Sequence, residues 1–181
     1  GEEQSGQIQE IGFGLYMDLL DRAVRSLKAG NQPQLDRPLD HGAEIEFHIA
    51  TLIPEDYLPD VQTRLIMYKR IASARDEDEL ESLQEEMIDR FGLLPESVKN
   101  LFAVTSLKHR AGPLGVRKID LGLKGGRIHF EKITRIDPVK IIQLIQQQSR
   151  IYKLDGSDKL RITKEFNDVQ TRLTFLYDLF H

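Results

Sequence analysis

The sequence contains no cysteine and no long uniformly apolar stretch. The absence of cysteine excludes disulfide bonds, thiolate nucleophiles and Cys-type metal sites, and it fits a reducing compartment. A membrane-spanning helix needs roughly 18 uncharged apolar residues, and residues 1–7 are acidic and polar, unlike a signal peptide. We therefore expect a cytoplasmic protein without a membrane anchor.

The charged residues are unevenly distributed along a chain of ordinary globular composition. The 181 residues suffice for one domain, or for one domain preceded by an appendage. The formal net charge of −4 argues against a dedicated DNA-binding domain. However, residues 76–89 contain eight acidic residues and no lysine or arginine, whereas residues 108–127 contain six basic residues and one acidic residue, Asp120. The sequence therefore contains one strongly acidic segment and one strongly basic segment.

The first 49 residues predict a helix, a linker and a strand. Apolar residues at helical spacing predict a helix over residues 11–29, with Gly30 as its C-terminal cap. Residues 31–42 contain two prolines and no periodicity, which is typical of a linker. The alternating residues 43–49 predict a half-buried strand whose inward-facing residues are Ile45, Phe47 and Ile49. We place the start of the main domain at residue 43.

Three helices are predicted next, at about residues 61–74, 77–91 and 95–109. Asp76 and Gly92 are the expected caps of the second helix. The residues expected to face the core are Leu65, Tyr68 and Ala72 in the first helix, Leu80, Leu83, Met87 and Phe91 in the second, and Val98, Leu101, Phe102 and Thr105 in the third.

The second half of the sequence alternates between strand and helix patterns. Residues 116–123 and 127–130 predict a β-hairpin with Lys124-Gly125-Gly126 as its turn, because glycine permits the positive φ angles of tight turns. The remaining predicted elements are a helix over residues 139–148, short strands at residues 151–154 and 159–162, and a closing helix over residues 167–180. The predicted fold class is α+β, with several helices packed on a small mixed or antiparallel sheet that includes one hairpin.

Residues with catalytic or metal-binding potential form no recognisable motif. No two of the five histidines are spaced i,i+3 or i,i+4, and none combines with acidic residues in a helical metal-site pattern. The glycines near residues 12–14 and 122–126 lack the context of a phosphate-binding loop, and no Gly-x-Ser-x-Gly nucleophile elbow is present. We therefore predict no catalytic residue, no metal site and no cofactor in this chain.

Each of two charged segments can be interpreted either as ordinary solvent-exposed surface or as a binding surface. The helix over residues 77–91 places Ser82, Glu85, Glu86 and Asp89 opposite its apolar residues. Such a face is either a solvated polar surface or a docking surface for a partner rich in arginine and lysine. The basic stretch Lys108–Arg127 serves either solubility or contact with nucleic acid, with Phe130 as the one nearby aromatic that could stack on a base. The residues alone leave both choices open.

Several motifs carry a resemblance to a known family. The first motif is Gly1-Glu2-Glu3-Gln4-Ser5-Gly6-Gln7-Ile8 followed by Gly12-Phe13-Gly14-Leu15-Tyr16. The second motif is Arg64-Leu65-x-x-Tyr68-Lys69-Arg70-Ile71-Ala72-Ser73-Ala74 followed by Ile88-Asp89-Arg90-Phe91-Gly92-Leu93-Leu94-Pro95. Both resemble the carboxy-terminal end of the bacterial transcription-repair coupling factors, Mfd, and further similarity covers nearly the whole chain.

The resemblance implies a division of the chain into three parts. Residues 1–30 would be a remnant of the second motor lobe, with Gln4 and Gly6 belonging to the end of its translocation motif. Residues 31–42 would be the linker, and residues 43–181 a carboxy-terminal regulatory domain. ATP and magnesium would be cofactors of the parent motor, a DNA translocase, and the fragment itself is expected to be non-catalytic.

The family also implies a function for the carboxy-terminal domain in a bacterial cytoplasm. This domain is implied to pack on a UvrB-like module of the same protein and to mask the surface that recruits UvrA, which makes the resting factor autoinhibited. The family's acidic pair falls on Glu86 and Asp89, beside Ser82 and Glu85. RNA polymerase and DNA would be bound through upstream domains, and the fragment is expected to be monomeric. The alternative is a DNA-contacting module that uses Lys108–Arg127.

Overall fold

The computed structural model describes residues 42–181. The predicted motor remnant, the linker and the residues Gln4 and Gly6 lie outside this range, apart from the last linker residue, Gly42. The described residues form two compact units, of which one comprises residues 50–105 and the other residues 42–49 together with 106–181.

The first unit is helical. It contains α2 (Val61–Ser73), α3 (Glu77–Phe91) and most of α4 (Glu96–Ala111). The carboxylate of Asp76 accepts a hydrogen bond from the backbone N–H of Glu79, and Gly92 ends α3 with φ of +98°. Both predicted caps of α3 are therefore confirmed.

The core of this unit lies between the three helices. Leu80, Leu83 and Met87 of α3 are buried as predicted, and Phe91 is partly buried. The prediction for α2 was wrong at Ala72, which is exposed, because the buried residues of this helix are Met67 and Ile71. Apolar residues surround much of α2, so helical spacing alone allowed more than one orientation. The other core residues are Ile53, Leu58, Ala74, Leu94, Val98 and Phe102.

The second unit contains a five-stranded mixed sheet with the order β1-β2-β3-β5-β4. Its strands are β1 (Glu44–Glu46), β2 (Val116–Gly122), β3 (Gly125–Phe130), β4 (Tyr152–Leu154) and β5 (Lys159–Thr163). The strands β1 and β2 are parallel, and all other neighbours are antiparallel. The predicted α+β class and the predicted hairpin are confirmed.

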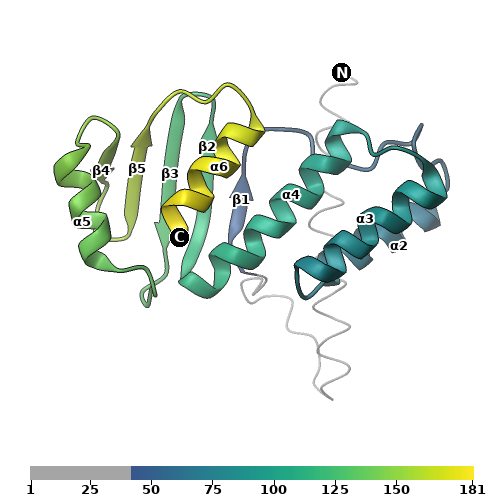
Figure 1. Ribbon diagram of the computed structural model, residues 1–181, viewed down its shortest axis with the longest axis horizontal. Coiled ribbons are helices and arrows are strands. Elements are labelled where there is room, and N and C mark those ends of the chain that lie inside the picture. The colour runs from purple at the N-terminus through teal and green to yellow at the C-terminus, as the bar shows by residue number, and fades with distance from the viewer. Residues whose placement is uncertain (1–41) are drawn as a thin grey trace, which may run out of the picture. The chain divides into compact units, whose positions relative to one another are not determined.

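Helices cover one face of this sheet. Figure 1 shows α6 (Val169–Phe180) lying over the strands, and α5 (Pro138–Gln147) beside the edge strand β4. A short 3-10 helix, η1 (Gly112–Leu114), joins α4 to β2. The apolar residues buried between sheet and helices include Ile119, Leu121, Ile128, Leu160, Ile162, Leu173 and Leu176.

The guanidinium of Arg172 on α6 joins the helix to the sheet. Its side chain is only 3% exposed and donates hydrogen bonds of 2.6 Å to the carbonyl of Phe47 and 3.3 Å to the carbonyl of Leu121. The guanidinium also lies 5.7 Å from the centre of the Phe47 ring. These contacts hold the chain after β1 and the end of β2 against α6.

The glycines of the hairpin lie in a strand and not in the turn, so the predicted turn was misplaced. Gly122 pairs with Gly125 at the end of the ladder, and Leu123 and Lys124 connect them. A Cβ atom on Gly126 would lie 1.8 Å from the carbonyl oxygen of Asp120. Gly126 is therefore required by the close approach of β2, and Gly125 by its φ of +108°.

Candidate docking surface on helix α3

The outer side of α3 carries the four polar residues that the sequence singled out. We call Ser82, Glu85, Glu86 and Asp89 the acidic face. The spacing i, i+3, i+4 and i+7 brings them to one side of the helix, because an α-helix turns by 3.6 residues. Ser82, Glu85 and Asp89 are exposed, and Glu86 is partly covered. The buried residues on the opposite side fix the direction of this face.

Glu86 is bound by two arginines of the same unit. The guanidinium of Arg70 on α2 donates hydrogen bonds to both of its carboxylate oxygens, the bond from Nη2 to Oε1 being 2.8 Å. Arg90, one turn further along α3, donates from Nη1 to Oε2 at 3.0 Å. The hydrogen bond from Arg70, followed by the one from Arg90, lowers the pKa of Glu86 to about 2. Its charge is therefore largely neutralised within the protein.

A series of aromatic contacts orders the carboxy-terminal end of α3. The guanidinium of Arg90 lies 4.7 Å from the centre of the Phe91 ring. This ring meets Tyr57 edge to face, with centroids 6.2 Å apart. The Tyr57 hydroxyl donates a 2.8 Å hydrogen bond to the carbonyl of Gly92. The backbone next to Asp89 is therefore held by packing as well as by helical hydrogen bonds.

The remaining negative charge of the acidic face resides on two side chains. Within residues 42–181, neither Glu85 nor Asp89 has a basic side chain within 4.0 Å. They lie one turn apart, with Ser82 in the preceding turn. The acidic face therefore presents two exposed carboxylates and one hydroxyl beside a carboxylate that is already paired.

Sequence reasoning missed the two arginines that bind Glu86. Arg90 could have been found, because an acidic residue and an arginine at i and i+4 commonly pair on a helix. Arg70 lies 16 residues before Glu86 and reaches it only because α2 packs beside α3. No local sequence signal could have found that contact.

The basic stretch Lys108–Arg127 is divided among a helix, two strands and a turn. Lys108 and Arg110 belong to α4, where the Arg110 guanidinium lies 5.2 Å from the centre of the Tyr177 ring. Lys124 lies in the hairpin turn. The other three, on strands β2 and β3, are Arg117, Lys118 and Arg127.

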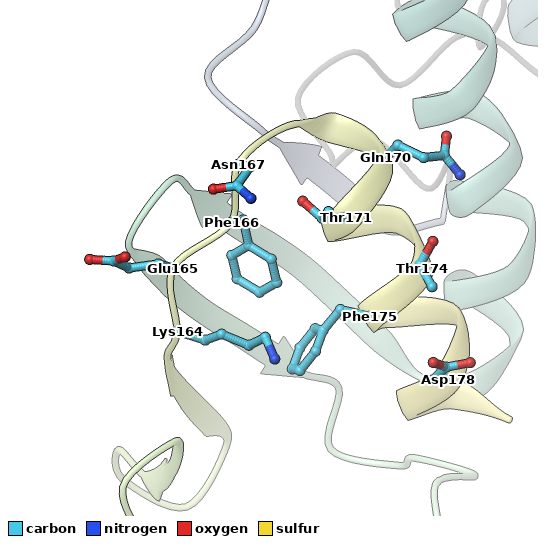
Figure 2. A pocket seen from close by; sticks show the side chains of 9 residues that line it. All are labelled: Lys164, Glu165, Phe166, Asn167, Gln170, Thr171, Thr174, Phe175 and Asp178. Carbon is cyan, nitrogen blue, oxygen red and sulfur yellow. The ribbon is translucent and has the colours of Figure 1, made fainter.

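A hollow of about 390 Å³ lies beside the start of α6 in the second unit (Figure 2). Two of the side chains that line it, Phe166 and Phe175, meet edge to face with ring centroids 5.2 Å apart. The Lys164 ammonium lies 5.6 Å from the Phe175 centroid. Figure 2 shows the Glu165 carboxylate pointing away from these rings, while Asp178 lies further along the helix. The lining of the hollow thus combines two aromatic rings with the charged side chains of Lys164, Glu165 and Asp178.

Residues 42–181 contain neither a metal-binding cluster nor a membrane-spanning helix. No group of three or more histidine, aspartate or glutamate side chains in this range could hold a metal ion. No helix in the same range is long and apolar enough to span a bilayer.

Comparison with known proteins places α3 within a known domain family. The family model described as the TRCF domain matches residues 47–141, which is more than half of the chain and includes α2, α3 and α4. The chain belongs to the TRCF domain family. The predicted relationship to transcription-repair coupling factors is therefore confirmed at the level of the family.

Curated relatives of this TRCF domain chain share its sequence over nearly its full length. The transcription-repair-coupling factor of Haemophilus influenzae is 48% identical over 179 residues, covering 99% of this chain and 16% of the relative. That of Escherichia coli is 44% identical over 176 residues, covering 97% of this chain and 15% of the relative. The chain thus spans about a sixth of the length of these relatives.

A solved structure shares the fold. It is described as the crystal structure of the C-terminal domain of a transcription-repair coupling factor, and it matches with a TM-score of 0.64 at 24% sequence identity. The match covers 77% of this chain and 89% of that one.

Proposed function

We propose that this chain is the regulatory module of a transcription-repair-coupling factor. In the resting protein its acidic face docks on an arginine-rich surface of the UvrB-like module and masks the surface that recruits UvrA. The observation that carries the proposal is the pair of exposed carboxylates, Glu85 and Asp89, which have no basic partner within residues 42–181 and project from a rigid helix in the matched family domain. Uncompensated charges on an ordered scaffold favour a complementary partner.

Glu86 has a different task from its two neighbours on the acidic face. It already receives hydrogen bonds from Arg70 and Arg90, so a partner arginine gains less from it than from an unpaired carboxylate. We assign to Glu86 the positioning of the two flanking arginines, which leaves Glu85 and Asp89 as the principal partner-binding residues. Ser82 adds a hydroxyl that can donate or accept at the edge of the contact.

The expected strength of this contact suits a clamp that can be released. An exposed ion pair contributes about 0.2–1 kcal/mol, and keeping an intramolecular contact closed in about 99% of molecules needs roughly 2–3 kcal/mol. A short tether supplies an effective concentration on the order of 1 mM, so a dissociation constant of about 10 µM between separate pieces suffices. Engagement of the motor with stalled RNA polymerase on DNA would then open the clamp.

We assign the motor activity of the full-length coupling factor to domains other than this chain. ATP hydrolysis with magnesium and DNA translocation are assigned to the motor upstream of the regulatory domain. Binding of RNA polymerase and of DNA is likewise assigned to upstream domains. The contribution of this chain is to couple those events to UvrA recruitment in DNA repair.

The proposal is tested by measuring binding in trans between the 181-residue chain and the isolated UvrB-like module by calorimetry. The variant Glu85→Arg/Asp89→Arg is expected to bind at least about ten-fold more weakly, because two attractions become repulsions. The matched control, Glu55→Arg/Asp56→Arg, reverses two exposed charges of the same unit outside α3. Equal affinity of the Glu85/Asp89 variant and the unmodified chain would contradict the proposal.

A further inference from the structure

Among the described residues, the helices leave one face of the sheet uncovered, and this face is polar. Along each strand the buried residues alternate with residues on the opposite face, such as Lys118 and Asp120 on either side of buried Ile119. Arg127 and His129 flank buried Ile128 in the same way. This uncovered side is the outer sheet face.

Cross-strand register arranges the outer sheet face into two rows. Residues that are directly opposite in neighbouring strands share a face, about 5 Å apart. The first row is Glu44, Lys118, His129 and Lys159, and the second row is Glu46, Asp120, Arg127, Arg161 and Lys153. The acidic residues of the two rows lie on β1 and β2, whereas the basic residues, apart from Lys118 on β2, lie on β3, β5 and β4.

The basic part of this face is enlarged by a β-bulge. The register of the hairpin shifts between Val116 and Lys118, which leaves Arg117 as the extra residue. The Arg117 Nη2 atom lies 3.2 Å from Nδ1 of His129, so its guanidinium belongs to the same face. We call the following six residues the basic sheet face: Arg117, Lys118, Arg127, Lys153, Lys159 and Arg161.

The basic sheet face carries more positive charge than its neighbours neutralise. Arg127 and Arg161 share one carboxylate, Asp155, at 2.7 and 3.8 Å. Lys118 lies 3.8 Å from Glu44. Lys153 and Lys159 have no carboxylate within 4.0 Å among residues 42–181. The surplus of charge therefore lies over β5 and β4.

The pKa of His129, in the middle of the first row, responds to the charges that surround it. Burial lowers the pKa of His129, and the nearby charges of Arg117, Lys159 and Lys118 lower it further, while Asp158 opposes them. Three cations from two strands thus act on one imidazole. Positive charge is thus concentrated around His129, although the chain as a whole carries a net charge of −4.

We propose that the basic sheet face binds the backbone phosphates of duplex DNA without reading its sequence. Six cations on one sheet face match a repeating phosphate backbone, which makes sequence-independent electrostatic contacts. The rows contain no phenylalanine, tyrosine or tryptophan, and their one aromatic ring is the imidazole of His129, so a single strand gains little from its exposed bases. Recognition of duplex RNA relies on contacts to 2′-hydroxyls, and these rows present mainly cations.

An acidic protein segment is a less suitable partner for the same surface. Stable protein contacts usually add apolar anchors at their centre. The two rows contain only charged residues and one histidine. This surface is therefore better suited to a partner whose contact groups are all anionic.

The test measures binding of the 181-residue chain to a fluorescein-labelled 30-base-pair DNA duplex by fluorescence anisotropy at several salt concentrations. Neutralisation of about three phosphates predicts that affinity falls about 40-fold between roughly 50 and 200 mM salt. The variant Lys153→Gln/Lys159→Gln should bind at least about ten-fold more weakly at low salt, with a flatter salt dependence. DNA binding should also raise the pKa of His129, measured by NMR.

The matched control is Lys99→Gln/Lys132→Gln, which removes the same charge from exposed positions outside the basic sheet face. The control should bind DNA like the unmodified chain. Equal weakening by both double variants would show that overall charge and not this surface is responsible, and would overturn the proposal. Equal binding to poly-glutamate, to duplex RNA or to single-stranded DNA at the same concentration of charge would overturn the assignment to duplex DNA.

This inference is independent of the docking proposed for α3. Its residues belong to the second unit, whereas the acidic face belongs to the first. Reversal of Glu85 and Asp89 is not expected to weaken DNA binding, and Lys153→Gln/Lys159→Gln is not expected to weaken binding of the UvrB-like module. Failure of one proposal can therefore be distinguished from failure of the other.

Discussion

Arg70 of α2 donates hydrogen bonds to both carboxylate oxygens of Glu86 on α3. This bidentate contact joins two helices and places a cation at the border of the acidic face. It also separates the roles of the acidic residues, because the charge of Glu86 is satisfied within the protein, whereas Glu85 and Asp89 have no basic partner in the described range. The candidate docking surface therefore offers fewer unpaired carboxylates to a partner than the sequence suggested.

The pairing of Glu86 predicts a loss of stability in acid. The folded pKa of Glu86, about 2, is below its ordinary value of 4.5. The carboxylate therefore stabilises the folded state above about pH 4.5, and this contribution is lost as the pH falls toward 2. Solvent screening limits the contribution to about 1 kcal/mol, since more than a third of the side chain is exposed.

Urea unfolding of Glu86→Gln at several pH values checks this expectation. The difference in free energy of unfolding from the unmodified chain should be about 1 kcal/mol near pH 7 and should vanish near pH 2. Glu55→Gln, at an exposed position, should show no such trend. A constant difference for Glu86→Gln across this range would show that its charge is not the cause.

Removal of the buried Arg172 guanidinium is expected to destabilise the second unit. Arg172→Met deletes the donors to the carbonyls of Phe47 and Leu121. Hydrogen bonds from charged groups contribute about 1.5–3 kcal/mol, so the free energy of unfolding should fall by about 3 kcal/mol. Arg135→Met, at an exposed position, should change it by less than about 0.5 kcal/mol. Similar unfolding curves for both variants would contradict the role given to Arg172.

The hairpin offers a matched pair of glycine substitutions. A Cβ atom at Gly126 would overlap the Asp120 carbonyl, whereas the nearest atom to a Cβ at Gly122 is 3.7 Å away. Gly126→Ala should therefore lower the free energy of unfolding by about 3 kcal/mol or more, and Gly122→Ala by less than about 1 kcal/mol. Thermal unfolding of both variants measures the difference. Equal stabilities would mean that the two strands can separate at no cost.

Local signals in the sequence account for the elements that were predicted well. The bounds of α3 were predicted as residues 77–91, because Asp76 and Gly92 mark its two ends and its apolar residues repeat regularly. The hairpin was predicted from the two glycines between its strand segments, which is a signal carried by neighbouring residues. Both kinds of signal are local.

Apart from the missed pair of Glu86 and Arg90, which are one helical turn apart, the errors and omissions involve contacts between different elements. Packing against α3 determines which residues of α2 are buried. The spacing of apolar residues within α2 could not reveal this. The close approach at Gly126 depends on the neighbouring strand, so its glycine was mistaken for a turn residue. The basic sheet face joins Arg127 to Arg161 and Lys153 through strand register, and no local motif marks that combination.

Capture of UvrA by a full-length transcription-repair-coupling factor that carries this chain tests the central claim most directly. We predict that Glu85→Arg/Asp89→Arg raises the fraction of UvrA captured in the absence of DNA and RNA polymerase, because the masking contact is lost. Glu55→Arg/Asp56→Arg should leave capture at the low level of the unmodified protein. UvrA capture that is equally low for all three proteins would contradict the assignment of α3 as the docking surface.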